Sequence, residues 1–87
     1  MSYRVELSRS AANYLRRLDR STQSRIVDRL DKIAEDPYGQ LTKPLTHSAG
    51  RRASRVGPYR IVFTVEEDAQ VVEISYIGPR GQIYRRL

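Results

Sequence analysis

Four arginines and no acidic residue fall in the segment from Arg51 to Phe63, RRASRVGPYRIVF. A guanidinium group is a planar fork of donors that stays charged at any working pH and matches the geometry of phosphate. Because the four charges repel one another, an unopposed cluster of this kind favours a polyanionic ligand. The alternative is a plain solvated strand edge in a chain that simply uses Arg in preference to Lys, 14 against 2.

Few other groups in the chain could carry chemistry. It contains no cysteine, one histidine and no paired acidic motif, so neither a thiolate nucleophile nor a metal centre is expected, and no cofactor is predicted. The histidine, His47, precedes the arginines, and an unperturbed imidazole suits a general base. His47 is therefore a candidate base if its segment folds over the arginines, and otherwise a surface residue.

Length and charge limit the fold and its partners. Eighty-seven residues are expected to form a single domain, residues 1–87, with one core built mainly from Leu, Ile, Val and Tyr. The net charge of +6 is shared equally by residues 1–43, nine basic minus six acidic, and 44–87, seven minus four, so there is no basic tail. No apolar run approaches the ~20 residues of a membrane span, and no signal peptide is recognisable. A cytoplasmic protein with anionic partners and no membrane contact is predicted.

The first half of the chain begins with alternating apolar and polar residues and then shows the spacing of apolar residues that is typical of a helix. Tyr3, Val5 and Leu7 alternate with polar residues, which predicts a strand over residues 2–7. Ser8 or Ser10 can cap a first helix, whose apolar stripe is Ala11, Tyr14, Leu15 and Leu18. A fresh cap within residues 19–21 predicts a second helix that runs to about residue 35 and forms a hairpin with the first.

The second half of the chain has the pattern of strands. Residues 36–50 contain two prolines and two glycines and are expected to form an ordered loop. Strands are predicted over residues 51–56, 58–66 and 70–77. In the middle strand Tyr59, Ile61, Phe63 and Val65 share one face, so Arg60 is expected to point to the other.

These elements predict an α+β fold in the order βααβββ. The helical hairpin packs on one face of a small, mainly antiparallel four-stranded sheet, and the first strand lies beside the last. The opposite face is left open. A small sheet whose uncovered side carries Arg60 is a candidate binding platform.

Several separated motifs together give the chain a family resemblance. They are Lys43-Pro-Leu45, the strand Arg55-Val-Gly-Pro-Tyr-Arg-Ile-Val-Phe63, Ile77-Gly-Pro-Arg80, and Tyr84 near the end. In this order they resemble the RelE/ParE toxin superfamily, and within it the RelE-like mRNA interferase branch. The resemblance covers essentially the whole chain and implies a RelE-like fold.

The resemblance also implies a function. RelE-like members are toxins of type II toxin–antitoxin systems that cut mRNA in the ribosomal A site, without a metal, by attack of the substrate's own 2′-hydroxyl on the adjacent phosphate. ParE-like members share the fold and instead inhibit DNA gyrase without being enzymes. The implied partners are a cognate antitoxin, which forms a hetero-oligomer with the toxin and binds operator DNA, together with the ribosome and mRNA.

Four residues match positions at which RelE-like toxins carry out cleavage. Arg60 corresponds to the strand arginine at the scissile phosphate, and Arg80 to the arginine beside the leaving oxygen. Tyr84 corresponds to the tyrosine on which a base of the codon stacks, and Arg51 to a basic residue that orients the 2′-hydroxyl or binds phosphate. A second group is expected to bind RNA or the ribosome: Lys43, Arg52, Arg55, Arg85 and Arg86.

Two departures from the RelE-like pattern concern proton transfer. The second basic strand residue of the family is Ala53 here, and the residue before the C-terminal arginine, often His in related toxins, is Pro79. Arginine stays protonated and is a poor base. The general base is therefore left unassigned, and the alternatives are a ParE-like gyrase inhibitor and a small RNA-binding protein without toxicity.

Overall fold

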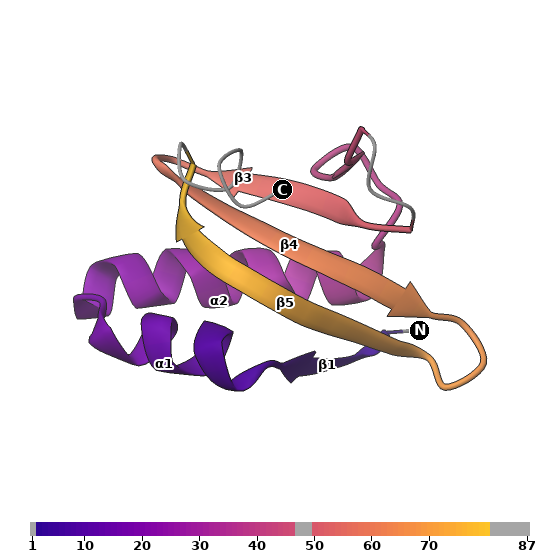
Figure 1. Ribbon diagram of the computed structural model, residues 1–87, viewed down its shortest axis with the longest axis horizontal. Coiled ribbons are helices and arrows are strands. Elements are labelled where there is room, and N and C mark those ends of the chain that lie inside the picture. Colours follow the sequence, from indigo (N-terminus) through magenta and orange to yellow (C-terminus); the bar gives the residue numbers. More distant parts are fainter. Residues whose placement is uncertain (1, 47–49, 81–87) are drawn as a thin grey trace.

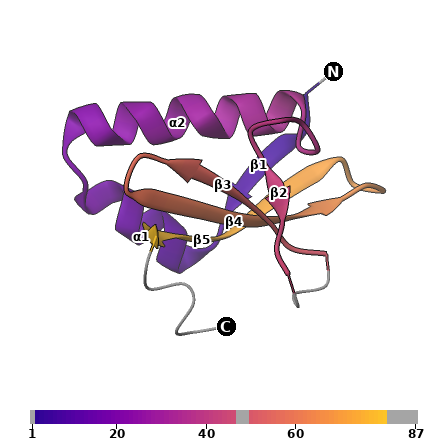
Figure 2. The ribbon, with the colours of Figure 1, turned by 90° about the horizontal axis from the view of Figure 1, so that it is seen from above.

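The structure is a computed structural model that describes residues 2–46 and 50–80. The described elements are β1 (Arg4–Leu7), α1 (Arg9–Arg17), α2 (Arg20–Glu35), β2 (Lys43–Pro44), β3 (Arg52–Val56), β4 (Tyr59–Glu66) and β5 (Val71–Pro79). Figure 1 shows their arrangement, and β2 is labelled in Figure 2. The predicted order is confirmed, with one addition. The segment expected to be a loop contributes the two-residue strand β2, so the sheet has five strands rather than four.

Each helix begins at a polar cap. The Ser8 hydroxyl accepts a hydrogen bond from the Ala11 N–H at 3.1 Å, so Ser8 rather than Ser10 starts α1. The Asp19 carboxylate accepts from the Thr22 N–H at 3.1 Å and starts α2. These caps satisfy donors that the first turn of a helix leaves unpaired. Because Asp19 follows α1 so closely, the two helices form a tight hairpin.

The sheet has the strand order β1-β5-β4-β3-β2. β1 runs parallel to β5, as expected for a first strand placed beside the last, and the other pairs are antiparallel. The register of β4 against β5 shifts once: Val62 pairs with Tyr76, whereas the next residue, Phe63, pairs with Ile74. Ser75 is passed over as a β-bulge, and β5 changes its alternation there.

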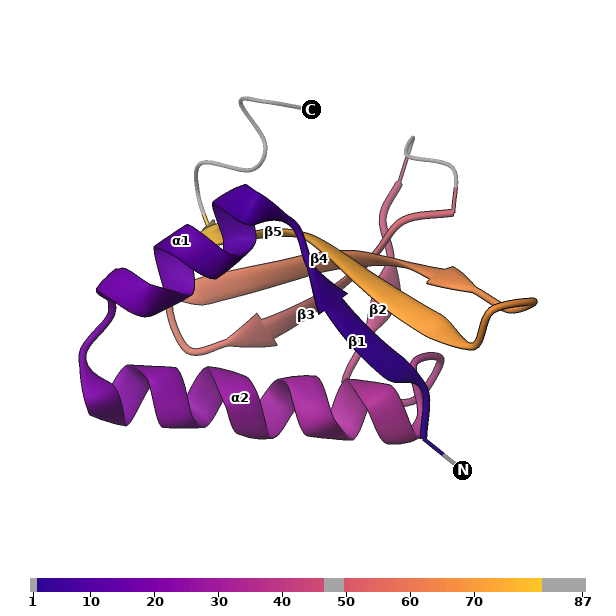
Figure 3. The same ribbon diagram turned by 90° about the horizontal axis from the view of Figure 1, so that it is seen from below.

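The helices cover the sheet unequally. Figures 2 and 3 show α2 along one face, while α1 lies beside the part of β5 that β1 does not reach. The core fills the space between α2 and the sheet, with Phe63 and Ile26 fully buried in it. No described helix covers the other face of the sheet. The predicted helical layer on a single face is confirmed, and α2 supplies most of it.

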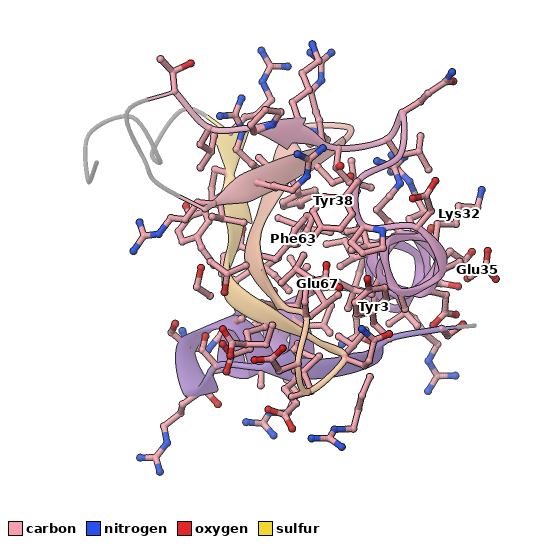
Figure 4. All side chains as sticks on the ribbon, turned by 90° about the vertical axis from the view of Figure 1, so that its right-hand side faces the viewer. Tyr3, Lys32, Glu35, Tyr38, Phe63 and Glu67 are labelled. Carbon is pink, nitrogen blue, oxygen red and sulfur yellow. The ribbon has the colours of Figure 1, made fainter. Side chains whose placement is uncertain are left out.

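Three segments meet at the edge of the molecule drawn in Figure 4. The Glu67 carboxylate, in the turn after β4, accepts a hydrogen bond from the Tyr3 hydroxyl at 2.9 Å and another from the Tyr38 hydroxyl. The Arg52 guanidinium lies 5.3 Å from the centroid of the Tyr38 ring. This tyrosine–glutamate cluster, Tyr3, Tyr38 and Glu67, ties the start of the chain and the loop after α2 to the β4–β5 turn.

None of the helices described is long and apolar enough to cross a bilayer.

Candidate functional site

The direction of each side chain in β3 follows from its contacts with α2. Arg29 of α2 donates a hydrogen bond from Nη1 to the Ser54 hydroxyl at 2.9 Å, and Val56 lies in the core. Ser54 and Val56 therefore face α2. Because side chains alternate along a strand, Ala53 and Arg55 face the uncovered side.

Arg55 and Arg60 lie directly opposite each other on this uncovered face. They are a register pair of β3 and β4, and Arg60 is paired on its other side with Gly78 of β5. Arg55 is exposed and Arg60 is half-buried. Two guanidinium groups at directly opposite positions concentrate positive charge that an anion can bind. The predicted orientation of Arg60 away from the apolar row is confirmed.

The neighbouring row on the same face contains Lys43, Ala53, Val62 and Tyr76. Lys43 pairs with Ala53, Ala53 with Val62, and Val62 with Tyr76. Lys43 is exposed. The position at which the sequence shows Ala53 in place of a basic residue is therefore flanked by a cation from the adjacent strand.

Arg80 and Arg51 border this face at the ends of strands. The Arg80 N–H donates to the Pro58 carbonyl at 3.0 Å, which fixes Arg80 beside the β3–β4 turn, two residues beyond Gly78. Arg51 immediately precedes β3 and is exposed, and its carbonyl accepts from the Leu45 N–H at 2.9 Å. The structure thus brings Arg55, Arg60 and Arg80 to one end of the sheet.

Arg52 does not belong to this group. As a neighbour of Ala53 it points to the opposite face, where its Nε donates to the Pro37 carbonyl at 3.1 Å and its Nη2 to the Thr42 hydroxyl at 2.9 Å. Thr42 itself is buried. We therefore revise the expectation that Arg52 contacts RNA, because its donors hold the loop between α2 and β2.

Four of the predicted site residues lie outside the described part of the chain. They are His47, the candidate base, and Tyr84, Arg85 and Arg86 of the C-terminal segment. Their roles stay predictions.

Tyr76 belongs to this face and was not predicted from the sequence. It lies on the uncovered side because the bulge at Ser75 changes the alternation of β5, while Ile77 faces the core opposite Ile61. A tyrosine in the strand beside Arg60, four residues before Arg80, was the available signal. The unforeseen bulge concealed which way its ring points.

Acidic groups are kept to the far end of the same face. Glu6 and Glu73 form a register pair there, next to Thr64 of β4. Thr64 is four residues from Arg60, which at the rise of a strand is roughly 13 Å. Within residues 2–46 and 50–80, the end of the face that carries Arg60 therefore offers cationic donors and an aromatic ring but no carboxylate. Such a site can hold a phosphate and stabilise charge that develops on it.

Comparison with protein families gives one match over most of the chain. A family model described as the ParE toxin of type II toxin–antitoxin systems matches residues 5–84. A curated relative, Toxin RelE of Mycobacterium tuberculosis, is 31% identical over an alignment of 85 residues that covers 95% of this chain and 87% of the relative.

Solved structures share the fold at lower identity. The toxin–antitoxin complex RelBE2 of Mycobacterium tuberculosis contains a chain with a TM-score of 0.81 and 23% identity, over 92% of this chain and 100% of that one. The RelE–RelB complex of Pyrococcus horikoshii gives 0.79 and 23%, over 94% and 99%. The isolated E. coli RelE toxin gives 0.80 and 19%, over 98% and 94%.

Proposed function

The chain belongs to the RelE/ParE toxin superfamily and is the toxin of a type II toxin–antitoxin system, and from this premise we propose that it is a ribosome-dependent endoribonuclease that cleaves mRNA in the A site. The observation that carries the proposal is the opposed pair Arg55 and Arg60 on the uncovered face, with Arg80 at the same end. Its curated relative is a RelE toxin, which favours the nuclease branch.

The proposed reaction is an in-line transfer within the RNA. The 2′-oxygen of one nucleotide forms a bond to the adjacent phosphorus as the bond from phosphorus to the 5′-oxygen breaks, which leaves a 2′,3′-cyclic phosphate and a 5′-hydroxyl. One proton leaves the 2′-hydroxyl and one reaches the 5′-oxygen. Arg60 holds the non-bridging oxygens and Arg80 stabilises the leaving oxygen. Arg51 comes one residue before the partner of Phe63 and so lies toward the Thr64 end of the face, and we propose that it binds a neighbouring phosphate of the RNA. Tyr84 stacks on a base of the codon.

Proton transfer in this proposal does not depend on a carboxylate of the toxin. Glu73 is too far from Arg60, as its place in the register shows. His47 remains the candidate base, and Lys43 supplies positive charge opposite Ala53. We propose that ribosomal positioning of the mRNA compensates for the basic residue that Ala53 replaces.

The remaining cations are proposed to bind the RNA backbone. Lys43 and Arg55 are exposed on the uncovered face, and Arg85 and Arg86 follow Tyr84 in the sequence. Each phosphate that such a residue neutralises adds affinity and salt dependence without taking part in the chemistry.

A cognate antitoxin is the proposed protein partner. Several of the structures with this fold are toxin–antitoxin complexes. We propose that the chain forms a hetero-oligomer with an antitoxin in the cytoplasm, and that the antitoxin attaches the complex to operator DNA.

Mapping mRNA cut sites on translating ribosomes tests the proposed activity. The wild-type toxin should produce cuts within codons that lie in the A site, and Arg60→Ala should slow their formation by ~10²–10³-fold. A ParE-like gyrase inhibitor is the second candidate, favoured by the family model and by Ala53 and Pro79, which replace candidate proton-handling residues of the nuclease pattern. Intact transcripts together with inhibited DNA supercoiling would overturn the nuclease and support gyrase inhibition.

A further inference from the structure

The ring of Tyr76 occupies space above a glycine. A Cβ added to Gly78 would lie 2.4 Å from the Tyr76 Oη, 2.6 Å from its Cζ and 3.1 Å from its Cε2. The same hydroxyl lies 3.5 Å from the Pro79 carbonyl oxygen. The ring therefore runs along β5 toward Arg80, and only a residue without a side chain at position 78 leaves room for it.

This placement puts the ring beside Arg60. Gly78 is the register partner of Arg60, and neighbouring strands lie roughly 4.8 Å apart. Arg60 and the phenol end of Tyr76 therefore occupy adjacent positions on the uncovered face. Both residues are half-buried.

Packing over Val62 accounts for only part of this arrangement. Val62 is 2% exposed although no described helix covers its face, and Tyr76 is its register partner, so the ring helps to shield it. The phenol end continues past Val62 over the buried backbone of Gly78, and so reaches the strand position beside Arg60. An aromatic surface is thus extended toward the arginines.

We propose that Tyr76 is a nucleobase-stacking residue of the RNA site, which rests on the proposed nuclease function. An arginine that grips only a phosphate leaves the attached nucleotide free to turn, whereas in-line attack needs a fixed geometry. A ring beside the phosphate supplies a second point of attachment, because every base has a π-face that stacks on an aromatic side chain. Tyr76 positions the nucleotide next to the phosphate held by Arg60.

The first test compares Tyr76→Leu with Tyr76→Phe in binding and in cleavage. Binding is measured with ribosomes whose A-site codon carries a 2′-deoxy substitution that prevents cleavage. Tyr76→Leu should weaken binding and raise KM by about ten- to a hundredfold, and Tyr76→Phe should restore most of the loss because the ring is kept. Tyr14→Leu is the matched control, since Tyr14 packs against the core and makes an edge contact with Tyr59. It should lower the melting temperature without changing KM.

The second test keeps the Tyr76 ring and fills the space that its phenol end occupies. Gly78→Ala keeps Tyr76 but sets a Cβ where its phenol end lies, so it should raise KM as Tyr76→Leu does. In a Tyr76→Ala background the space is vacant, and adding Gly78→Ala should cause no further rise. Additive effects of the two changes, measured on variants that still fold, would show that Gly78→Ala acts elsewhere and would contradict the stacking role.

The outcomes separate this inference from the proposed function. If the wild-type toxin cuts no mRNA, the nuclease proposal fails and the stacking role fails with it. If the wild type cuts mRNA and Tyr76→Leu binds and cuts equally well, only the stacking role is overturned. A loss in Tyr76→Leu that Tyr76→Phe shares in full, or that merely follows a lower melting temperature, also overturns it.

Discussion

Arg60 and Arg55 carry the same charge and lie opposite each other on adjacent strands, but we expect them to have different roles. Arg60 is half-buried between Arg55 and Gly78, whereas Arg55 is exposed. A donor fixed by its surroundings stabilises a transition state better than a mobile one. The register alone therefore makes them a matched pair for mutagenesis.

Replacing each arginine by alanine should separate chemistry from binding. Arg60→Ala is expected to lower kcat by ~10²–10³-fold, because a preorganised donor at the developing charge is lost. Arg55→Ala should mainly raise KM. Single-turnover cleavage on translating ribosomes measures both, and melting temperatures establish that each variant folds. Equal effects of the two substitutions on kcat would contradict this division.

Arg52 is an arginine whose side-chain donors hold the loop between α2 and β2. Arg52→Ala removes the donors to the Pro37 carbonyl and to the buried Thr42 hydroxyl. The Thr42 hydroxyl keeps its own hydrogen bond to the Pro37 carbonyl, so the loss is that of the hydrogen bonds from a charged donor, and it should lower the free energy of unfolding by about 1.5–3 kcal/mol. Urea unfolding measures the loss, and the turnover of the folded fraction should stay at the wild-type level. A normal stability with a large loss of turnover would return Arg52 to the RNA site.

At the scale of elements, the sequence predicts what periodicity and caps encode. The strand alternation around Arg60, the helical stripes and the cap at Asp19 all lead to the observed fold. Two features escape this logic. The partner of Arg52 is Thr42, ten residues earlier in a loop, and the direction of Tyr76 depends on a bulge at Ser75. Both are set by tertiary contacts that a single strand's pattern does not contain.

The loop and turn elements are held together by the tyrosine–glutamate cluster. The hydrogen bond to Glu67 is the main cause that raises the pKa of Tyr38 to about 12, and burial is the second cause. The hydrogen bond from Tyr38, followed by the one from Tyr3 as a smaller cause, lowers the pKa of the Glu67 carboxyl. The bond therefore stabilises the fold most while the phenol is protonated and the carboxylate is charged. Stability from this cluster should fall at both extremes of pH.

The alkaline side gives a specific prediction for Tyr38. The unfolded chain releases the phenolic proton near pH 10 and the folded chain near 12, so the contribution is complete below pH 10 and is lost between 10 and 12. On the acid side the contribution of Glu67 is present above pH 4.5 and is lost as the pH falls through the lowered pKa. Urea unfolding of the wild type should show a steeper loss from pH 10 to 12 than Tyr38→Phe. Parallel curves for the two proteins would contradict the role of this bond.

The whole molecule has unlike ends. Arg55, Arg60 and Arg80 lie at the β3–β4 turn, and Glu6 and Glu73 occupy the far end of the same face. The positive region continues past the turn, because an Arg25 guanidinium nitrogen lies 2.8 Å from the place where a Cβ of Gly57 would be. Charge separated in this way steers a protein toward a polyanion with one end leading. We expect the turn end to meet RNA first.

This polarity predicts which cations contribute to salt-dependent binding. Lys43→Gln and Arg55→Gln should each reduce the slope of log affinity against log salt by about 1, since each removes one phosphate contact. Arg4→Gln is the matched control, because Arg4 forms an ion pair with Glu6 at 3.0 Å at the acidic end of the face. It changes the net charge equally and should leave the slope unchanged. Ribosome binding of the three variants, titrated from low to physiological salt, measures the slopes. Equal reductions in all three would mean that net charge rather than the position of each cation determines the interaction with RNA.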